Sequence, residues 1–124
     1  MLGSGIAHPP LPLRQQMWDW MQQALTRSGG NPSAGLALHR TFLEAGLPPP
    51  QMRAHAPVNN GVDANFDLAV AGVRTWLPRI LEFGIATAEE IDVDTLGERL
   101  RAAFAAEQRA AIGPISVDAW ARKP

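Results

Sequence analysis

Only two segments of the chain carry the two-residue alternation of apolar and polar side chains that is typical of β-strands. The first extends over residues 51–58 and the second over residues 115–122. Pro57 lacks an amide donor, so the end of the first strand is expected at an edge or a bulge. An isolated pair of strands is marginal in water and leaves edges of unpaired amides and carbonyls. The pattern therefore predicts two strands that are built to join a larger sheet.

The segments before residue 50 are predicted to be an irregular lead and two helices. Residues 1–13 are rich in glycine and proline, and proline both lacks an amide donor and restrains the residue before it. A helix is predicted over residues 14–27, ending before Gly29 and Gly30, and its apolar face is formed by Met17, Trp20, Met21 and Ala24. A second helix is predicted to begin with Asn31 as N-cap and Pro32 in its first turn and to stop at Gly46, with an apolar stripe at Ala34, Leu38, Phe42 and Ala45.

Three further helical segments are predicted between the two strands. The longest is expected to be capped by Asp63, kinked at Pro78 and closed at Gly84, and its stripe consists of Phe66, Val70, Val73, Leu77 and Ile80. Thr87 and Glu90 have the spacing of a capping box, which predicts a short helical turn. The last helix is expected to begin at Asp94 or Thr95, and its stripe consists of Leu96, Leu100, Ala103 and Phe104.

These patterns predict an α+β fold that is mostly helical, with four to five helices and a two-stranded antiparallel pair. Residues 14–124 are expected to form a single domain after the irregular lead of residues 1–13. The length of 124 residues allows one domain with a modest core, and 46% hydrophobic residues supply that core.

Charge and cysteine content exclude several classes of function. The chain has 11 Lys and Arg against 12 Asp and Glu, interspersed along the sequence, so it offers no basic face to nucleic acid. Cysteine is absent, which excludes disulfides and thiolate metal sites and fits the cytoplasm. The apolar runs are too short for a membrane span, and the lead has no pattern of a signal peptide. We expect a cytoplasmic protein that binds neither nucleic acid nor membranes.

Methionine and tryptophan are concentrated on the predicted helix over residues 14–27, beyond what one buried face requires. Such stripes are usually core, but adaptable thioethers beside flat indoles also suit an apolar ligand pocket. His8, in the proline-rich lead, is a second kind of candidate because loops can present a base to a ligand. The candidate substrate-binding residues are His8, Met17, Trp18, Met21, Trp76 and Ile80. No catalytic, cofactor-binding or metal-ligating residue is predicted, since the three histidines are scattered.

Four stretches of the chain resemble one family. They are Pro9–Pro12, Leu38–Pro48, Gly84–Asp92 and Val117–Pro124. Taken in this order they are similar to the C-terminal region of class I S-adenosylmethionine-dependent methyltransferases of the ubiquinone/menaquinone-biosynthesis type. The resemblance spans nearly the whole chain.

The resemblance implies that the two strands belong to a seven-stranded methyltransferase sheet with a Rossmann-like arrangement. Residues 51–58 would be its sixth strand, and residues 115–122 its seventh, antiparallel beside the fifth. The first helix, the long helix and residues 84–110 would cap the acceptor substrate. The glycine-rich loop, the ribose-binding acid and the first five strands of the family have no counterpart in this sequence. The resemblance therefore assigns no catalytic or cofactor-binding residue here.

The expected function is that of the substrate-capping portion of such a methyltransferase, inactive alone. S-adenosylmethionine is implied for the complete enzyme and not for this chain by itself. The expected partners are the missing cofactor-binding domain, or a second copy joined through strand edges, and a small apolar acceptor. The alternative is a free-standing helical module that binds an apolar ligand or dimerises.

Overall fold

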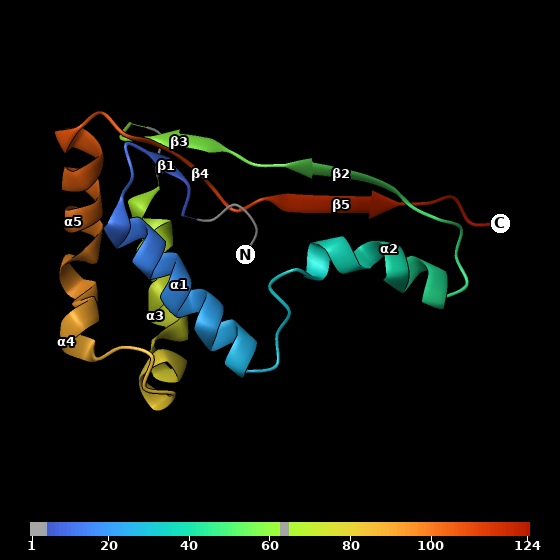
Figure 1. Cartoon of the computed structure of the whole chain (residues 1–124), viewed down its shortest axis with the longest axis horizontal. Coiled ribbons are helices and arrows are strands. Elements are labelled where there is room, and N and C mark those ends of the chain that lie inside the picture. Colours follow the sequence, from blue (N-terminus) through green and yellow to red (C-terminus); the bar gives the residue numbers. More distant parts are fainter. Residues whose placement is uncertain (1–4, 63–64) are drawn as a thin grey trace.

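A helical body and a narrow arm are joined by one long β-ribbon in the computed structural model, which describes residues 5–62 and 65–124 (Figure 1). The elements in chain order are β1 (Ala7–His8), α1 (Pro12–Arg27), α2 (Ala34–Glu44), β2 (Gln51–His55), β3 (Val58–Asn60), α3 (Phe66–Glu82), α4 (Ala88–Ile91), α5 (Val93–Ala106), β4 (Ala110–Ile112) and β5 (Ser116–Trp120). The predicted α+β, mostly helical fold is confirmed.

The body is built from α1, α3 and α5, whose apolar stripes meet in one core. The predicted stripe of α1 is buried in full, while α3 buries Phe66, Val73 and Ile80 and α5 buries Leu96, Leu100 and Phe104. The rings of Phe66 and Phe104 meet edge to face, with their centroids 5.3 Å apart. The three-to-four-residue spacing of apolar residues thus positions the three helices against one another.

Local caps fix the connections between these helices. The Thr87 hydroxyl accepts from the Glu90 amide at 3.1 Å, as the capping-box spacing predicts, and Gly84 ends α3 in the left-handed conformation at φ 64°. The predicted cap Asp63 lies outside the described residues, and the Asn65 side chain accepts from the Leu68 amide at the start of α3. The last helix begins at Val93, slightly before the predicted start.

The ribbon consists of two antiparallel sheets in succession, one in the body and one in the arm (Figure 1). β3 pairs with β4 in the body and β2 pairs with β5 in the arm, where Gln51 lies opposite Trp120. The single strand predicted over residues 51–58 is therefore two strands, separated near Pro57, whose carbonyl accepts from the Gly113 amide at 2.9 Å. The predicted pairing of the two strand segments is correct, but β4 was not predicted.

The lead is more ordered than its proline content predicts. β1 pairs antiparallel with β4, placing Ala7 opposite Ala111, and α1 begins at Pro12. Leu11 is only 5% exposed and belongs to the core. The prediction of an irregular lead is wrong for this part, because a two-residue edge strand needs few amide donors and proline is favoured in the first turn of a helix. Residues 1–4 lie outside the described part of the chain.

The arm consists of β2, β5 and α2, and it has almost no interior. α2 lies against β5, where the Gly35 backbone approaches Val117 so closely that a Cβ at this glycine would be 2.9 Å from the Val117 Cβ. No residue of α2 is buried and every residue of β2 is exposed. The alternation over residues 51–58 also predicts that one side of this strand is buried, which is wrong for β2, because α2 packs against β5 and leaves every residue of β2 exposed.

The joint between body and arm is expected to be sensitive to a single methyl group. A Cβ at Gly113 would lie 2.7 Å from Pro57 Cγ, and a proline ring cannot rotate away. Gly113→Ala is expected to lower the free energy of unfolding by about 1–3 kcal/mol through overpacking. At Gly61 an added Cβ would make an ordinary 3.6 Å contact, so Gly61→Ala is the matched control. Equal urea midpoints for the two variants would contradict this account of the joint.

Candidate functional site

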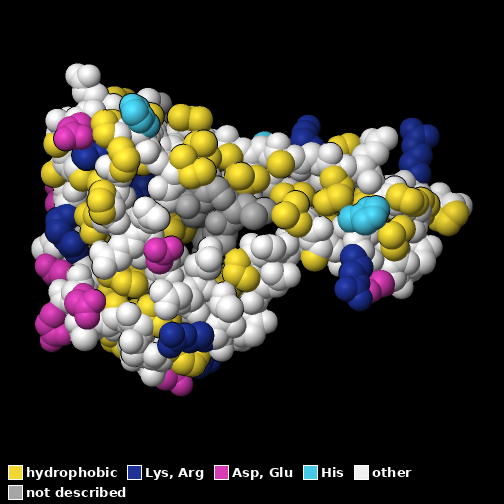
Figure 2. All heavy atoms as spheres, viewed as in Figure 1, with side chains coloured by type: hydrophobic (Ala, Val, Ile, Leu, Met, Phe, Trp, Pro, Cys, Tyr) yellow, Lys and Arg dark blue, Asp and Glu magenta, His cyan; other side chains and the backbone are white. Residues whose placement is uncertain are grey.

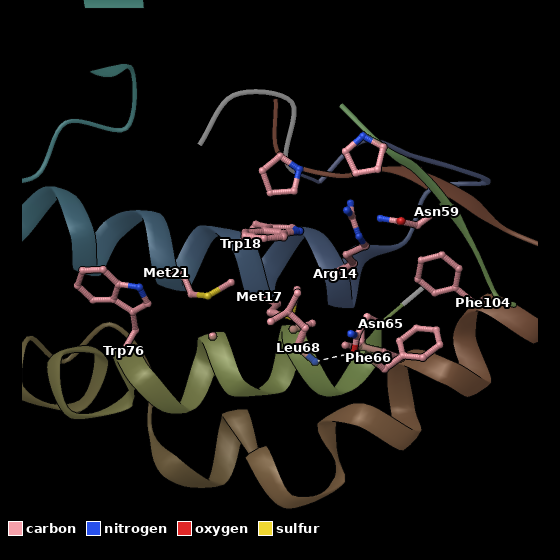
Figure 3. A pocket seen from close by; sticks show the side chains of 15 residues that line it. Arg14, Met17, Trp18, Met21, Asn59, Asn65, Phe66, Leu68, Trp76 and Phe104 are labelled. Atoms are coloured by element: carbon pink, nitrogen blue, oxygen red, sulfur yellow. Dashed lines mark hydrogen bonds between the residues drawn. The ribbon is translucent and has the colours of Figure 1, made fainter. Parts of the chain in front are cut away.

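A cavity of about 420 Å³ lies between α1 and α3, where it is closed at one end by the ribbon (Figure 3). Its walls carry four sulfur or indole side chains, four other large apolar side chains from α3 and α5, and two prolines of the ribbon joint. These are Met17, Trp18, Met21, Trp76, Phe66, Leu68, Leu100, Phe104, Pro57 and Pro114. Such a volume and lining suit a small, mostly apolar molecule.

Small residues on α3 leave room for the cavity opposite the large side chains of α1. Ala69 and Gly72 lie on the wall of the cavity, one helical turn apart. A Cβ at Gly72 would lie 3.5 Å from the Met21 sulfur, so α1 and α3 approach each other closely there. Leu68, which is 68% exposed, lies at the rim. The cavity therefore has a solvent-accessible side as well as a deep apolar wall.

One end of the cavity is polar. Arg14, Asn59 and Asn65 lie together there in Figure 3, while Trp76 lies at the other end with Met21 and Met17 between. Arg14 is 5% exposed, and its Nη2 donates to the Ile112 carbonyl of β4 at 2.7 Å. Burial lowers the pKa of the Arg14 guanidinium, because desolvation disfavours the cation.

Four of the six predicted substrate-binding residues are brought together by this cavity. Met17, Trp18, Met21 and Trp76 all line it. Ile80 is fully buried in the core of the body and does not line the cavity. His8 is exposed on β1, also away from the cavity. The two readings of the methionine and tryptophan stripe therefore both apply, because Met17 and Met21 belong to the core as well as to the cavity wall.

Arg14 is the cavity residue that matters most among those the sequence did not predict. It precedes Met17 by three positions and Trp18 by four, so it lies on the same side of α1 as the apolar stripe. A charged residue within an apolar stripe is unusual, because charged side chains are almost never fully buried unless paired. The position of Arg14 within the apolar stripe was therefore the sequence signal that could have identified it as a cavity residue.

The open face of the arm carries the other group of interacting side chains. Arg53 Nη2 lies 3.1 Å from Asp118 Oδ2, and His55 Nε2 lies 3.4 Å from the same oxygen. The hydrogen bond from Arg53 is the main cause that lowers the pKa of the Asp118 carboxyl. The Arg53 guanidinium also lies 6.0 Å from the Trp120 ring centroid. These contacts hold β2 and β5 in register, but they are exposed and weak.

The arm also presents apolar side chains to solvent. Figure 2 shows hydrophobic side chains gathered along the arm, with basic side chains among them. The large exposed ones on its elements are Leu36, Leu43, Met52 and Trp120. Several exposed apolar residues on one narrow unit are typical of a surface that another chain covers.

The outer edge of the ribbon is covered in the body but not in the arm. In the body β4 is central, with β1 on one side and β3 on the other. In the arm β5 pairs only with β2, and no strand among the described residues lies beside β5 at the position that corresponds to β1. A five-residue strand with one unpaired edge is a template for another strand.

The described residues contain no group of three or more histidine, aspartate or glutamate side chains that could hold a metal ion. None of the helices seen in the structure is long and apolar enough to cross a membrane. Comparison of the chain with protein-family models, with curated proteins and with solved structures finds no match.

Proposed function

We propose that this chain is the substrate-capping portion of a cytoplasmic S-adenosylmethionine-dependent methyltransferase, whose cofactor-binding part pairs with the free edge of β5. The observation that carries the proposal is that β5 pairs with β2 alone among the described residues, whereas β4, in the other half of the ribbon, is paired on both sides. The resemblance supports the same arrangement, because it implies a fifth strand next to this segment. The absence of cysteine fits the reducing compartment.

In this function the cavity between α1 and α3 holds the acceptor. Methyl transfer from a sulfonium donor is a displacement in which the two reacting atoms must be held in line and close together. An apolar cavity contributes by fixing the acceptor and by excluding water from it. The residues that do this are Met17, Trp18, Met21 and Trp76, which line the wall. Methyl transfer itself requires the cofactor-binding part.

The chain alone is expected not to bind S-adenosylmethionine. A nucleoside cofactor of this kind binds in a crevice at the carboxyl ends of parallel strands, and every strand pair among the described residues is antiparallel. Calorimetric titration of the isolated chain with S-adenosylmethionine should give only the heat of dilution. A saturable site with a micromolar dissociation constant would contradict the proposed division of labour.

The proposal is tested by supplying the missing sheet. The reading frame adjacent to the one that encodes this chain is the first candidate, and a glycine-rich cofactor loop in its product would identify it. Co-expression of the two should give a complex that transfers a labelled methyl group from S-adenosylmethionine to an apolar acceptor. Each protein alone should be inactive. An adjacent protein that carries the loop and methylates equally well without this chain would contradict the proposal.

The geometry of β5 also favours a second candidate, a homodimer that binds an apolar ligand in each copy. Antiparallel pairing of two identical strands is compatible with a twofold axis, so two β5 edges can satisfy each other. In that case the chain needs no cofactor-binding part, and the cavity serves binding only. A stable dimer that shows no methyl transfer with any adjacent gene product would favour this candidate.

A further inference from the structure

The cavity contains a buried cation, Arg14, that has no counter-charge among the described residues. Arg14 Nη1 is inaccessible to solvent and has no hydrogen-bond acceptor in residues 5–62 and 65–124. None of the ion pairs formed by these residues includes Arg14. An unpaired buried donor on a charged group is more costly than one on a neutral group. An acceptor that enters the cavity would therefore gain an interaction that the protein leaves unmade.

A second unpaired donor lies next to the first. Trp18 Nε1 is buried and has no acceptor within the same part of the chain. The Arg14 guanidinium carbon is 5.8 Å from the centroid of the Trp18 ring, and Figure 3 shows the indole nitrogen on the side of the ring that faces Arg14. Both side chains line the cavity. Two neighbouring N–H donors, one of them cationic, suit an anionic oxygen group.

The remainder of the cavity restricts the occupant to a mostly apolar body. From the Arg14 end, the wall continues along Met17 and Met21 to Trp76 (Figure 3). No carboxylate side chain of the described residues lines the cavity. The arrangement is that of an elongated apolar site with one polar end.

We propose that the cavity binds a small apolar molecule carrying one carboxylate, which accepts hydrogen bonds from Arg14 Nη1 and Trp18 Nε1. Both nitrogens are shielded in the ligand-free conformation, so the carboxylate reaches them through a small rotation of the guanidinium or the indole. The inference rests on the proposed function only in treating the cavity as the acceptor site. The carboxylate pairs with Arg14, so the apolar end of the acceptor points away from Arg14.

Three probes with one ring system test the charge requirement directly. Naphthalene-2-carboxylate, naphthalene-2-carboxamide and 2-naphthylmethylammonium differ only at the group that would meet Arg14. In calorimetric titrations of the full chain the carboxylate is expected to bind at least about tenfold more tightly than the carboxamide, the gain of one charge-assisted hydrogen bond. The ammonium compound is expected to bind most weakly of the three.

Variants of the two donors identify the residues responsible. Arg14→Gln should lower the affinity for the carboxylate to that for the carboxamide, while the carboxamide affinity changes little. Trp18→Phe keeps an aromatic ring and removes the N–H, and it should weaken carboxylate binding about threefold to tenfold. Arg79→Gln is the matched control, because Arg79 is exposed on α3 and pairs with Glu82 outside the cavity. It should leave all three affinities unchanged.

Equal affinities of the unchanged protein for carboxylate and carboxamide would overturn the inference, and so would failure of both to bind. This comparison needs no variant, so a folding defect in Arg14→Gln cannot obscure it. Methyl transfer by a completed enzyme without any carboxylate preference would refute this inference alone. Carboxylate-selective binding by a chain that never supports methyl transfer would refute the proposed function alone.

Discussion

Replacing Trp20 with alanine is expected to lower the free energy of unfolding by about 3–5 kcal/mol, whereas Trp18→Ala should cost well under about 3 kcal/mol. Both residues lie on α1, two positions apart. Trp20 is 4% exposed, belongs to the core and does not line the cavity. Trp18 faces the cavity, so part of its surface has no packing partner to lose, and its buried Nε1 has no acceptor among the described residues.

Urea unfolding followed by far-UV circular dichroism measures this difference without depending on tryptophan fluorescence. Trp18→Phe and Trp20→Phe are useful companions, because they keep an aromatic ring at each position. The difference between the two alanine variants should shrink in the phenylalanine pair. A loss of about 3–5 kcal/mol at Trp18 would show that the residue is tightly packed, and the cavity would then be part of a closed core.

The isolated chain is expected to self-associate through β5, with a mass in light scattering above the 13.4 kDa of one copy at high micromolar concentration. The reason is the unpaired edge, which a second strand can satisfy, together with the exposed apolar side chains of the arm. A proline on the open edge removes a donor from the new ladder, so it should abolish association completely.

Two adjacent prolines distinguish loss of docking from loss of the arm itself. Successive N–H groups of a strand point to opposite sides, so of Val117 and Asp118 one donates toward β2 and the other toward the open edge. Val117→Pro and Asp118→Pro should therefore differ. The variant whose missing N–H faced the open edge should lose association and keep slow amide exchange along β2. The variant whose missing N–H faced β2 should lose the slow amide exchange along β2. A monomer at high concentration with slow exchange along all of β5 would contradict an open edge.

The helices of the body are predictable because their signal is local. Apolar spacing identifies α1, α3 and α5, and the pattern at Thr87 and Glu90 identifies the cap of α4. β4 is not predictable in the same way, since Ala110–Ile112 is a short apolar run without alternation. Its strand conformation comes from pairing with β1 and β3, which are distant in sequence.

The arm shows the opposite limit, where a correct local pattern predicts the wrong environment. The alternation over residues 51–58 indicates a strand, and β2 is one, but its apolar side is exposed. Alternation indicates which side of a strand is apolar, but it does not indicate which element packs against that side. At the cavity, Met17, Trp18, Met21 and Trp76 were predictable from composition and spacing. Arg14 lies in the same stripe of α1, but its acceptor, the Ile112 carbonyl, is 98 residues away, and local spacing does not predict that contact.

Pro57 and Pro114 lie at the joint of the ribbon and also in the wall of the cavity. A strand that docks on β5 would therefore pair with a segment that begins two residues after Pro114 in the cavity wall. If docking moves this joint, the two events share a coupling free energy, and the coupling is reciprocal. A ligand in the cavity would then tighten or loosen the docked strand by the same factor that the strand changes ligand affinity. Through Pro57 and Pro114, the affinity for the docked strand and the affinity for the ligand would then depend on each other.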